Sequence, residues 1–264
     1  MTLQRSTFIG EGVGHFPLRF PEKKLDLDQD EEWCEVKCDD TWKRIRLHDY
    51  HEIYRIPGLY EALFVDRLKC CSPERVIGLL DDVLSDFPPS MEDLSVLDVG
   101  AGNGMVGEEL HKAGVRTIQG IDIIPRARVA ALRDRPQIYD DYFVCDLTQP
   151  DNPYDDRIRL AKLNTLTVVA ALGYGDIPPA AFVRACNLID TPGWLAFNIK
   201  ENFLDVDEDN TGFCALIRHL RRHGCIQVEA YRRYQHRLSI NGKPLHYIAM
   251  VARKIKPIPV SMLR

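Results

Sequence analysis

The chain has 264 residues, a hydrophobic fraction of 45% and a formal net charge of −5. This length accommodates one large α/β domain with an extension, or two small domains, and the composition excludes a fibrous or wholly disordered chain. No run of about eighteen apolar residues is present, which excludes a membrane-spanning helix. The acidic balance argues against a duplex nucleic-acid binder. Because the first residues lack the layout of a secretory signal, we expect a cytoplasmic protein with reduced cysteines.

The N-terminal part of the chain differs in character from the rest. It contains scattered Gly and Pro, an acidic stretch at residues 26–32 and then many aromatic residues, with a short helix expected after the Pro57-Gly58 turn. This composition is typical of a mobile arm or lid rather than a packed domain. We therefore divide the chain into an N-terminal arm or lid, residues 1–71, and a core domain, residues 72–264.

From residue 72 the pattern predicts alternating helices and strands. Ser72-Pro73-Glu74 is a helix start, with a hydroxyl cap, a proline at the first helical position and an acid against the helix dipole. The predicted strands are Leu94–Val99, Thr117–Ile121, Tyr142–Cys145, Leu166–Ala170, Trp194–Asn198, Ile226–Tyr231 and Leu245–Val251. Helices are predicted at Met105–Lys112, after Pro125, at Ile177–Leu188 and around Phe213–Leu220.

This order of elements predicts the fold class. Repeated βα units with apolar strands form a parallel sheet covered by helices on both faces. The last two predicted strands have no helix between them, and Asn241-Gly242 in their connection is a strong hairpin signal. We predict a three-layer αβα, Rossmann-like fold whose seven-stranded, mostly parallel sheet ends in a C-terminal antiparallel hairpin.

Polar and glycine residues gather where the first three core strands end. Glycines allow a close backbone approach to a ligand, and a helix N-terminus behind them offers unpaired N–H groups. Asp122 ends the second core strand, where an acid can accept both ribose hydroxyl protons, and Asp146 ends the third, within reach of an adenine amino group. Together they predict a site for an adenosine-containing cofactor.

A nicotinamide cofactor is the competing interpretation, because residues 102–107 also satisfy G-x-G-x-x-G and Asp122 follows at a suitable distance. Three features weigh against an NAD(P)-dependent dehydrogenase. The motif opens far from the chain start, Asp98 stands where a dinucleotide-binding strand is usually apolar, and the chain ends in a hairpin instead of a second mononucleotide-binding half.

The segment Val96-Leu97-Asp98-Val99-Gly100-Ala101-Gly102-Asn103-Gly104 resembles the first motif of class I S-adenosylmethionine-dependent methyltransferases. Asp122 matches the ribose-binding acid of that family, Cys145-Asp146-Leu147 resembles its adenine-contacting segment, and the hairpin matches its last two strands. The resemblance covers about residues 75–253. It implies S-adenosyl-L-methionine as cofactor, held by Asp98, Gly100, Ala101, Gly102, Asn103, Gly104, Asp122, Ile123, Cys145, Asp146, Leu147, Ala170, Ala171 and Tyr50.

A narrower resemblance concerns the acceptor side. Residues 170–179 resemble the fourth-strand segment of small-molecule methyltransferases, including the methyltransferase-like protein of the Williams–Beuren region, and lack the Asp/Asn-Pro-Pro-Tyr/Phe signature of amino-group methylases. Residues 48–54 resemble the aromatic lid of this family. We expect the catalytic residues to be His51, as a base, with Tyr54 and Tyr174.

The resulting prediction is a methyltransferase that acts on a small molecule by in-line methyl transfer, without a nucleic-acid or membrane partner, as a monomer or homodimer. A methyltransferase for a protein side chain and a non-catalytic methyltransferase-like binding domain remain as alternatives. The intact glycine motif with both Asp122 and Asp146 argues against the last.

Two further clusters have simpler explanations than a binding site. One is a cysteine and histidine set whose spacing fits no common zinc finger, so we predict no metal site; its members are Cys34, Cys38, His48 and His51. The other is basic, and a solvated helix face accounts for most of it; it consists of Arg218, Arg221, Arg222, Arg232 and Arg233.

Overall fold

The computed structural model describes residues 17–21, 27–38, 40–86, 88–173, 175–205, 207 and 209–259. The chain divides into two compact units. The N-terminal unit combines residues 1–70 with residues 236–245, and the core unit combines residues 71–235 with residues 246–264. Each unit has its own hydrophobic core. No helix in the described part of the chain is long and apolar enough to cross a membrane.

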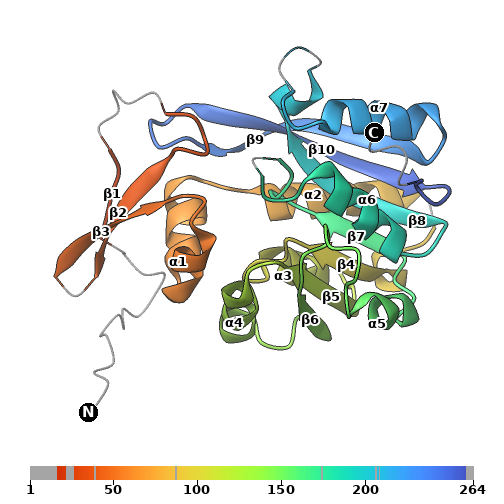
Figure 1. Ribbon diagram of the computed structural model, residues 1–264, viewed down its shortest axis with the longest axis horizontal. Coiled ribbons are helices and arrows are strands. Elements are labelled where there is room, and N and C mark those ends of the chain that lie inside the picture. The colour runs from red at the N-terminus through yellow and green to blue at the C-terminus, as the bar shows by residue number, and fades with distance from the viewer. Residues whose placement is uncertain are drawn as a thin grey trace. The chain divides into compact units, whose positions relative to one another are not determined.

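The core unit contains a seven-stranded sheet in the order β6-β5-β4-β7-β8-β10-β9 (Figure 1). Its strands are β4 (Ser95–Val99), β5 (Thr117–Asp122), β6 (Asp141–Val144), β7 (Thr165–Val168), β8 (Gly193–Lys200), β9 (Ile226–Leu238) and β10 (Pro244–Lys254). Strands β4 to β8 pair in parallel, and β10 pairs with β8 in the antiparallel sense. The predicted Rossmann-like fold with a C-terminal antiparallel hairpin is confirmed.

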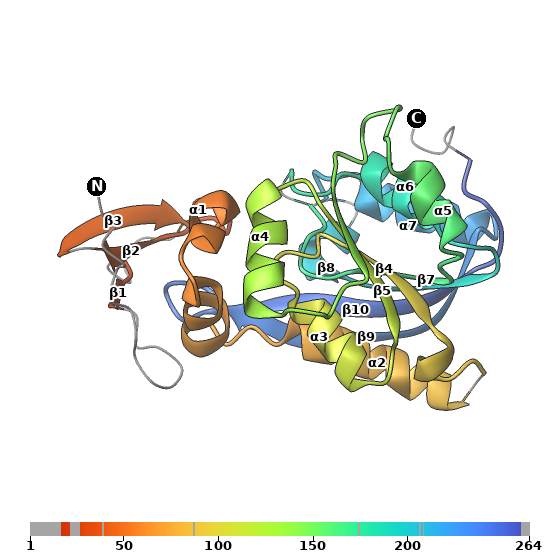
Figure 2. The same ribbon diagram turned by 90° about the horizontal axis from the view of Figure 1, so that it is seen from below.

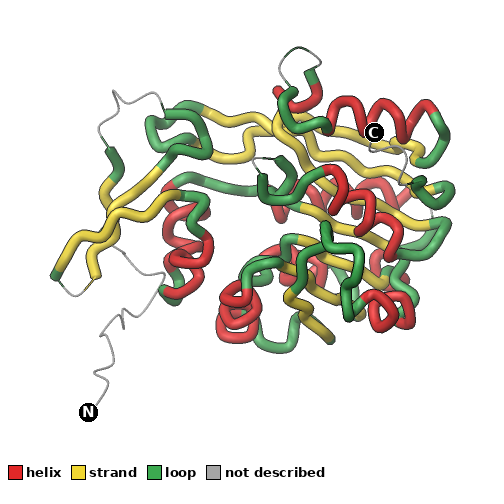
Figure 3. The backbone as a smooth tube through the Cα atoms, viewed as in Figure 1, coloured by secondary structure: helices red, strands yellow, loops and turns green. Residues whose placement is uncertain are grey.

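Helices cover both faces of this sheet, as the view along the sheet in Figure 2 shows, and they are drawn in red in Figure 3. The helices are α2 (Ser72–Asp86), α3 (Met105–Lys112), α4 (Pro125–Asp134), α5 (Asp155–Leu160), α6 (Pro179–Leu188) and α7 (Phe213–Arg222). One apolar cluster joins the sheet to α5, α6 and α7, and a second joins it to α2 and α3. The three layers therefore enclose two apolar interfaces, one on each face.

Local chemistry explains where the elements begin and end. Helix α2 starts at Ser72-Pro73, as predicted, and α3 starts after Gly104, whose φ of +93° suits a residue without a side chain. Strand β7 is shorter than predicted and ends at Val168, because the chain turns at Ala170, which has a φ of +55°. Helix α6 likewise begins only at Pro179, because a proline fits the first helical position and disfavours helix at the residue before it.

The N-terminal unit contains three antiparallel strands that we did not predict. They are β1 (Leu18–Arg19), β2 (Trp33–Cys38) and β3 (Thr41–Arg46), and they precede α1 (Tyr50–Arg55) and a π-helix (Glu61–Arg67). Strand β2 buries the side chains of Cys34 and Val36, which alternate with more exposed ones as in a strand with one covered face. The short helix expected after Pro57-Gly58 is present as the π-helix.

The tip of the β9–β10 hairpin belongs to the N-terminal unit. Arg237 pairs with Glu32 at 2.6 Å, and both side chains are almost completely buried. Glu32 also accepts the backbone N–H of Ile240 at 2.8 Å, and the N–H of Leu238 donates to the Leu68 carbonyl. A buried ion pair of this kind needs both partners, because removing one leaves an uncompensated charge.

Candidate functional site

The glycine loop between β4 and α3 is fixed by its own backbone. The N–H groups of Gly100 and Ala101 donate to the Ile121 carbonyl at 2.9 and 3.0 Å, which ties the loop to the end of β5. Gly100 has a φ of +73°, and a Cβ at this position would lie 2.8 Å from the Ala171 Cβ. Only glycine meets both the conformation and the close approach. The loop after β7 therefore packs directly on the glycine loop.

Asp122, at the end of β5, holds the same loop from the other side. One of its carboxylate oxygens accepts the Gly102 N–H at 2.9 Å, and the other accepts the Ile124 N–H at 2.8 Å. The side chain is largely buried, and this burial raises its pKa. Since each carboxylate oxygen can accept more than one hydrogen bond, Asp122 keeps acceptor capacity for a ligand after fixing the loop.

Asp98 lies within β4, below the loop, and its two carboxylate oxygens are both engaged. They accept hydrogen bonds from the Thr167 hydroxyl at 2.7 Å and from the Tyr139 hydroxyl at 2.8 Å. Burial, and next the charge of Asp98, raise the pKa of Tyr139, so its hydroxyl keeps the proton that it donates. Tyr142 acts on the loop directly, since its hydroxyl donates to the Gly102 carbonyl at 2.7 Å.

Burial raises the pKa of Asp98 to about 6, against a usual value of about 3.9. The folded protein thus binds this proton more tightly than the unfolded chain, and the contribution of Asp98 to the free energy of unfolding is full below about pH 4 and falls as the pH rises to about 6. We expect the difference in unfolding free energy between wild type and Asp98→Asn to shift by about 2 kcal/mol, against the wild type, between about pH 4 and pH 7. Urea denaturation at several pH values measures this difference, and a pH-independent difference would contradict the assignment.

The residues predicted to contact adenine follow β6. Cys145 donates its backbone N–H to the Asp122 carbonyl at 3.1 Å, which places the ends of β5 and β6 side by side. The Asp146 carboxylate accepts hydrogen bonds from Thr148 and Gln149, and these lower its pKa. The Leu147 side chain is buried in the core. Ile123, which follows β5 and was predicted to bind the cofactor, is 58% exposed.

Ala170 and Ala171, also predicted to bind the cofactor, are held by Asn198. The Asn198 side-chain oxygen accepts the Ala170 N–H at 2.6 Å, and its amide nitrogen donates to the hydroxyls of Tyr234 and Ser72 at 2.6 and 3.1 Å. Asn198 and Ser72 are completely buried. This network joins α2, β8 and β9 to the turn after β7, and it secures the left-handed conformation of Ala170.

The same loop also carries Asp176. The residue is exposed, but partial desolvation by the surrounding protein and next the negative charge of Asp122 raise the pKa of its carboxyl group to about 7. A carboxyl group with this pKa takes up and releases protons near neutral pH. Tyr174, two residues earlier and one of the predicted catalytic residues, lies outside the described residues.

The remaining predicted site residues lie on α1 in the N-terminal unit; they are Tyr50, predicted to bind the cofactor, and His51 and Tyr54, predicted to be catalytic. Tyr50 and Tyr54 stack with ring centroids 6.0 Å apart, and Tyr54 stacks further on Tyr60 at 5.5 Å. Tyr54 is 7% exposed, whereas His51 is exposed. All eight cysteines are free thiols, and the described residues contain no group of three or more metal-ligating side chains close enough for a metal ion.

Sequence reasoning missed the side chains that support the loop from a distance, namely Tyr139, Tyr142 and Thr167. One signal is visible in retrospect. A Cβ at Gly107 would lie 2.8 Å from the Tyr139 ring, and one at Gly120 would lie 2.9 Å from the Tyr142 ring. Gly107, the last glycine of the apparent G-x-G-x-x-G, thus makes room for a tyrosine of the protein.

No family model and no curated protein matches this sequence. Among solved structures, a protein from Pyrococcus horikoshii assigned as an RNA methyltransferase is similar with a TM-score of 0.51 at 12% identity, over 78% of this chain and 90% of that one. The N-methyltransferase NodS from Bradyrhizobium japonicum, in complex with S-adenosyl-L-homocysteine, is similar with a TM-score of 0.50 at 16% identity, over 78% of this chain and 98% of that one. At these identities the likeness establishes the fold alone. The chain has the Rossmann-like fold that these two methyltransferases share.

Proposed function

We propose that the chain is an S-adenosylmethionine-dependent methyltransferase. The observation that carries this proposal is the pairing of Asp122 with the glycine loop: a buried carboxylate at the end of β5 fixes Gly102 and keeps acceptor capacity toward the same crevice. In open α/β sheets, ligands bind outside the carboxyl ends of the strands, where the strand order reverses. Strands β4 and β7 flank that reversal here.

The residues around this crevice suit the parts of the cofactor. Asp122 would accept the ribose hydroxyls, the exposed Ile123 would cover one face of the adenine ring, and backbone groups of Gly100 to Gly104 would surround the amino-acid portion. Asp98 is 1% exposed and accepts hydrogen bonds from two side chains of the protein, so we assign it a supporting role beneath the loop. The fold of NodS, which binds S-adenosyl-L-homocysteine, supports the same cofactor.

The order of the strands disfavours the dehydrogenase alternative. A dinucleotide-binding sheet is built from two parallel mononucleotide-binding halves, whereas here the antiparallel β10 lies between β8 and β9.

The bound cofactor supplies an electrophilic methyl group on a sulfonium centre. The task of the chain is to hold the acceptor in line with that group, and positioning of this kind can contribute roughly 7–11 kcal/mol to lowering the barrier. Asp176, with a pKa of about 7, is suited to take a proton from an acceptor that must lose one. We retain His51, Tyr54 and Tyr174 as predicted acceptor-side residues and a small molecule as the proposed acceptor, with a protein side chain as the alternative.

Calorimetry with S-adenosylmethionine, S-adenosylhomocysteine and NADH tests the proposal. We expect the first two to bind and NADH not to bind. Ile123→Ser should weaken binding about tenfold, because an adenine face would lose its apolar cover. Val129→Ser on α4 is the matched control, since Val129 is 62% exposed, and it should change nothing. Binding of NADH alone, or equal effects of the two substitutions, would overturn the proposal.

A further inference from the structure

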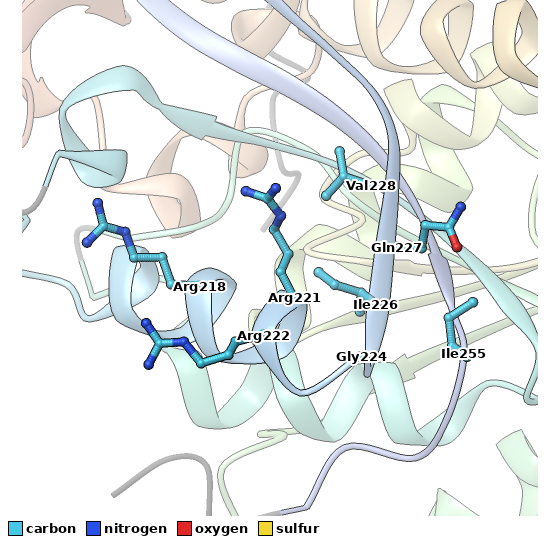
Figure 4. Close-up of a pocket in the computed structure, with 8 residues that line it drawn as sticks. All are labelled: Arg218, Arg221, Arg222, Gly224, Ile226, Gln227, Val228 and Ile255. Carbon is cyan, nitrogen blue, oxygen red and sulfur yellow. The ribbon is translucent and has the colours of Figure 1, made fainter.

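A groove opens where the end of α7 meets the start of β9 (Figure 4). Its volume is about 780 Å³. Three arginines of α7 line one side, and apolar side chains of β9 and of the segment after β10 line the floor; these residues are Arg218, Arg221, Arg222, Ile226, Val228 and Ile255. Arg221 extends over the start of β9, whereas Arg218 and Arg222 lie further back on the helix.

The groove lies at the opposite end of the sheet from the proposed cofactor site. Lys254, the last residue of β10, pairs with Gly193, the first residue of β8, and the N–H of Ile255 donates to the Cys225 carbonyl. The groove is therefore at the amino ends of the parallel strands, while Gly100 and Asp122 are at their carboxyl ends. A ligand in the groove would not occupy the cofactor crevice.

The three arginines differ from others of the basic cluster in their partners. Arg232 pairs with Asp82 at 3.1 Å and Arg233 with Glu201 at 2.7 Å. Within the part of the chain that the structure describes, no carboxylate lies within ion-pair distance of the guanidinium groups of Arg218, Arg221 or Arg222. We predicted that these arginines lie on a solvated helix face. That prediction does not explain why three positive charges are grouped here without a carboxylate partner among the described residues.

The stability of α7 does not require three arginines near its C-terminal end. A cation near the end of a helix is favoured by the dipole, and any one of the three would serve. Arg218 and Arg222, however, are four residues apart on one helix, and like charges at this spacing repel each other. Three such charges at the edge of a groove with an apolar floor are instead complementary to a ligand that carries several negative charges.

Strand β9, next to the arginines, indicates which class of negatively charged ligand fits the groove. Strand β9 is the edge of the sheet, so one row of its backbone N–H and C=O groups faces away from β10 and can pair with an added strand. An extended acidic peptide matches the strand edge, the arginines and the apolar floor. Its backbone can pair with the edge of β9, its carboxylates can pair with the arginines, and its apolar side chains can pack on Ile226 and Val228. A single-stranded nucleic acid fits less well, because none of the described residues that line the groove is an aromatic that could stack on a base.

We propose that this groove docks an extended acidic segment of a partner protein. The inference does not depend on the methyltransferase assignment, because it rests on residues at the other end of the sheet.

The test uses the full chain and a fluorescein-labelled peptide of alternating glutamate and valine, followed by fluorescence anisotropy at low salt. Reversing the three charges together, Arg218→Glu with Arg221→Glu and Arg222→Glu, should weaken binding by at least about tenfold. The control combines Arg232→Glu with Arg233→Glu, which reverses charges on β9 outside the groove, and it should change the affinity less than about twofold. Circular dichroism and a cooperative urea denaturation transition would verify that both variants are folded.

Three results would overturn the inference. The first is that the wild type does not bind the glutamate–valine peptide. The second is that the control variant loses as much affinity for the peptide as the triple groove variant does. The third is that a single-stranded uridine oligonucleotide binds the wild type more tightly than the peptide does, and that the triple groove variant loses this binding. The last result would assign the surface to nucleic acid.

Discussion

Replacing Asp122 by alanine is expected to weaken the binding of S-adenosylmethionine and S-adenosylhomocysteine by at least about tenfold. The substitution removes the proposed ribose acceptor, and a hydrogen bond to a charged group contributes about 1.5–3 kcal/mol. It also releases the N–H groups of Gly102 and Ile124, which would loosen the loop that surrounds the ligand. Isothermal titration calorimetry measures both affinities.

Two further variants separate these effects. Asp122→Asn keeps one acceptor oxygen and should lose less affinity than Asp122→Ala. Asp156→Ala removes an exposed acid from α5 and should leave binding unchanged. If Asp122→Ala bound the cofactor as tightly as wild type, the ribose role of this residue and the proposed function would both fail.

Asn198→Ala should destabilise the protein by about 2–3 kcal/mol, since a buried polar group left without a partner costs about 1–3 kcal/mol. The N–H of Ala170 would lose its acceptor in a conformation that is already unfavourable for a residue with a side chain. Because the next residue, Ala171, packs on Gly100, we also expect weaker cofactor binding. Urea denaturation gives the free energy of unfolding, and calorimetry gives the affinity.

Tyr234→Phe is the graded control, because it removes one hydroxyl and leaves Asn198 bonded to Ser72 and Ala170. We expect it to cost about 1 kcal/mol, less than Asn198→Ala. Equal costs for the two variants would show that the bond to Ala170 contributes nothing of its own, contrary to the role we assign to Asn198.

The glycine loop and Asp122 could be predicted from the sequence, because their positions depend on neighbouring residues along the chain. The glycine loop follows directly from its strand and precedes its helix, and Asp122 ends the next strand, so periodicity and turn chemistry sufficed to bring them together. The hydroxyl of Tyr139 reaches Asp98 across 41 positions of sequence, and the Ser72–Asn198 bond spans 126. No periodic pattern specifies such contacts, because they depend on how distant elements pack.

The strands β2 and β3 were missed for a different reason. Their inward positions include Cys34 and Val36, but their outward positions carry tryptophan as well as charged residues, which obscures the alternation of apolar and polar residues. Arg44 lies over the Trp33 ring at 3.8 Å and Arg19 over the Trp42 ring at 3.7 Å, so these two half-buried tryptophans are covered by arginines. An aromatic-rich segment that suggested a lid thus contains a sheet.

The hairpin tip that carries Arg237 makes the N-terminal unit discontinuous along the chain. The polypeptide passes between the two units at three places: after Cys70, after Gln235 and after Leu245. No single cleavage can therefore release the N-terminal unit with all its parts, and a fragment ending at Cys70 would lack the cation that neutralises the buried Glu32. Transfer of this unit to another core, by recombination or by design, would require the hairpin to be transferred with it.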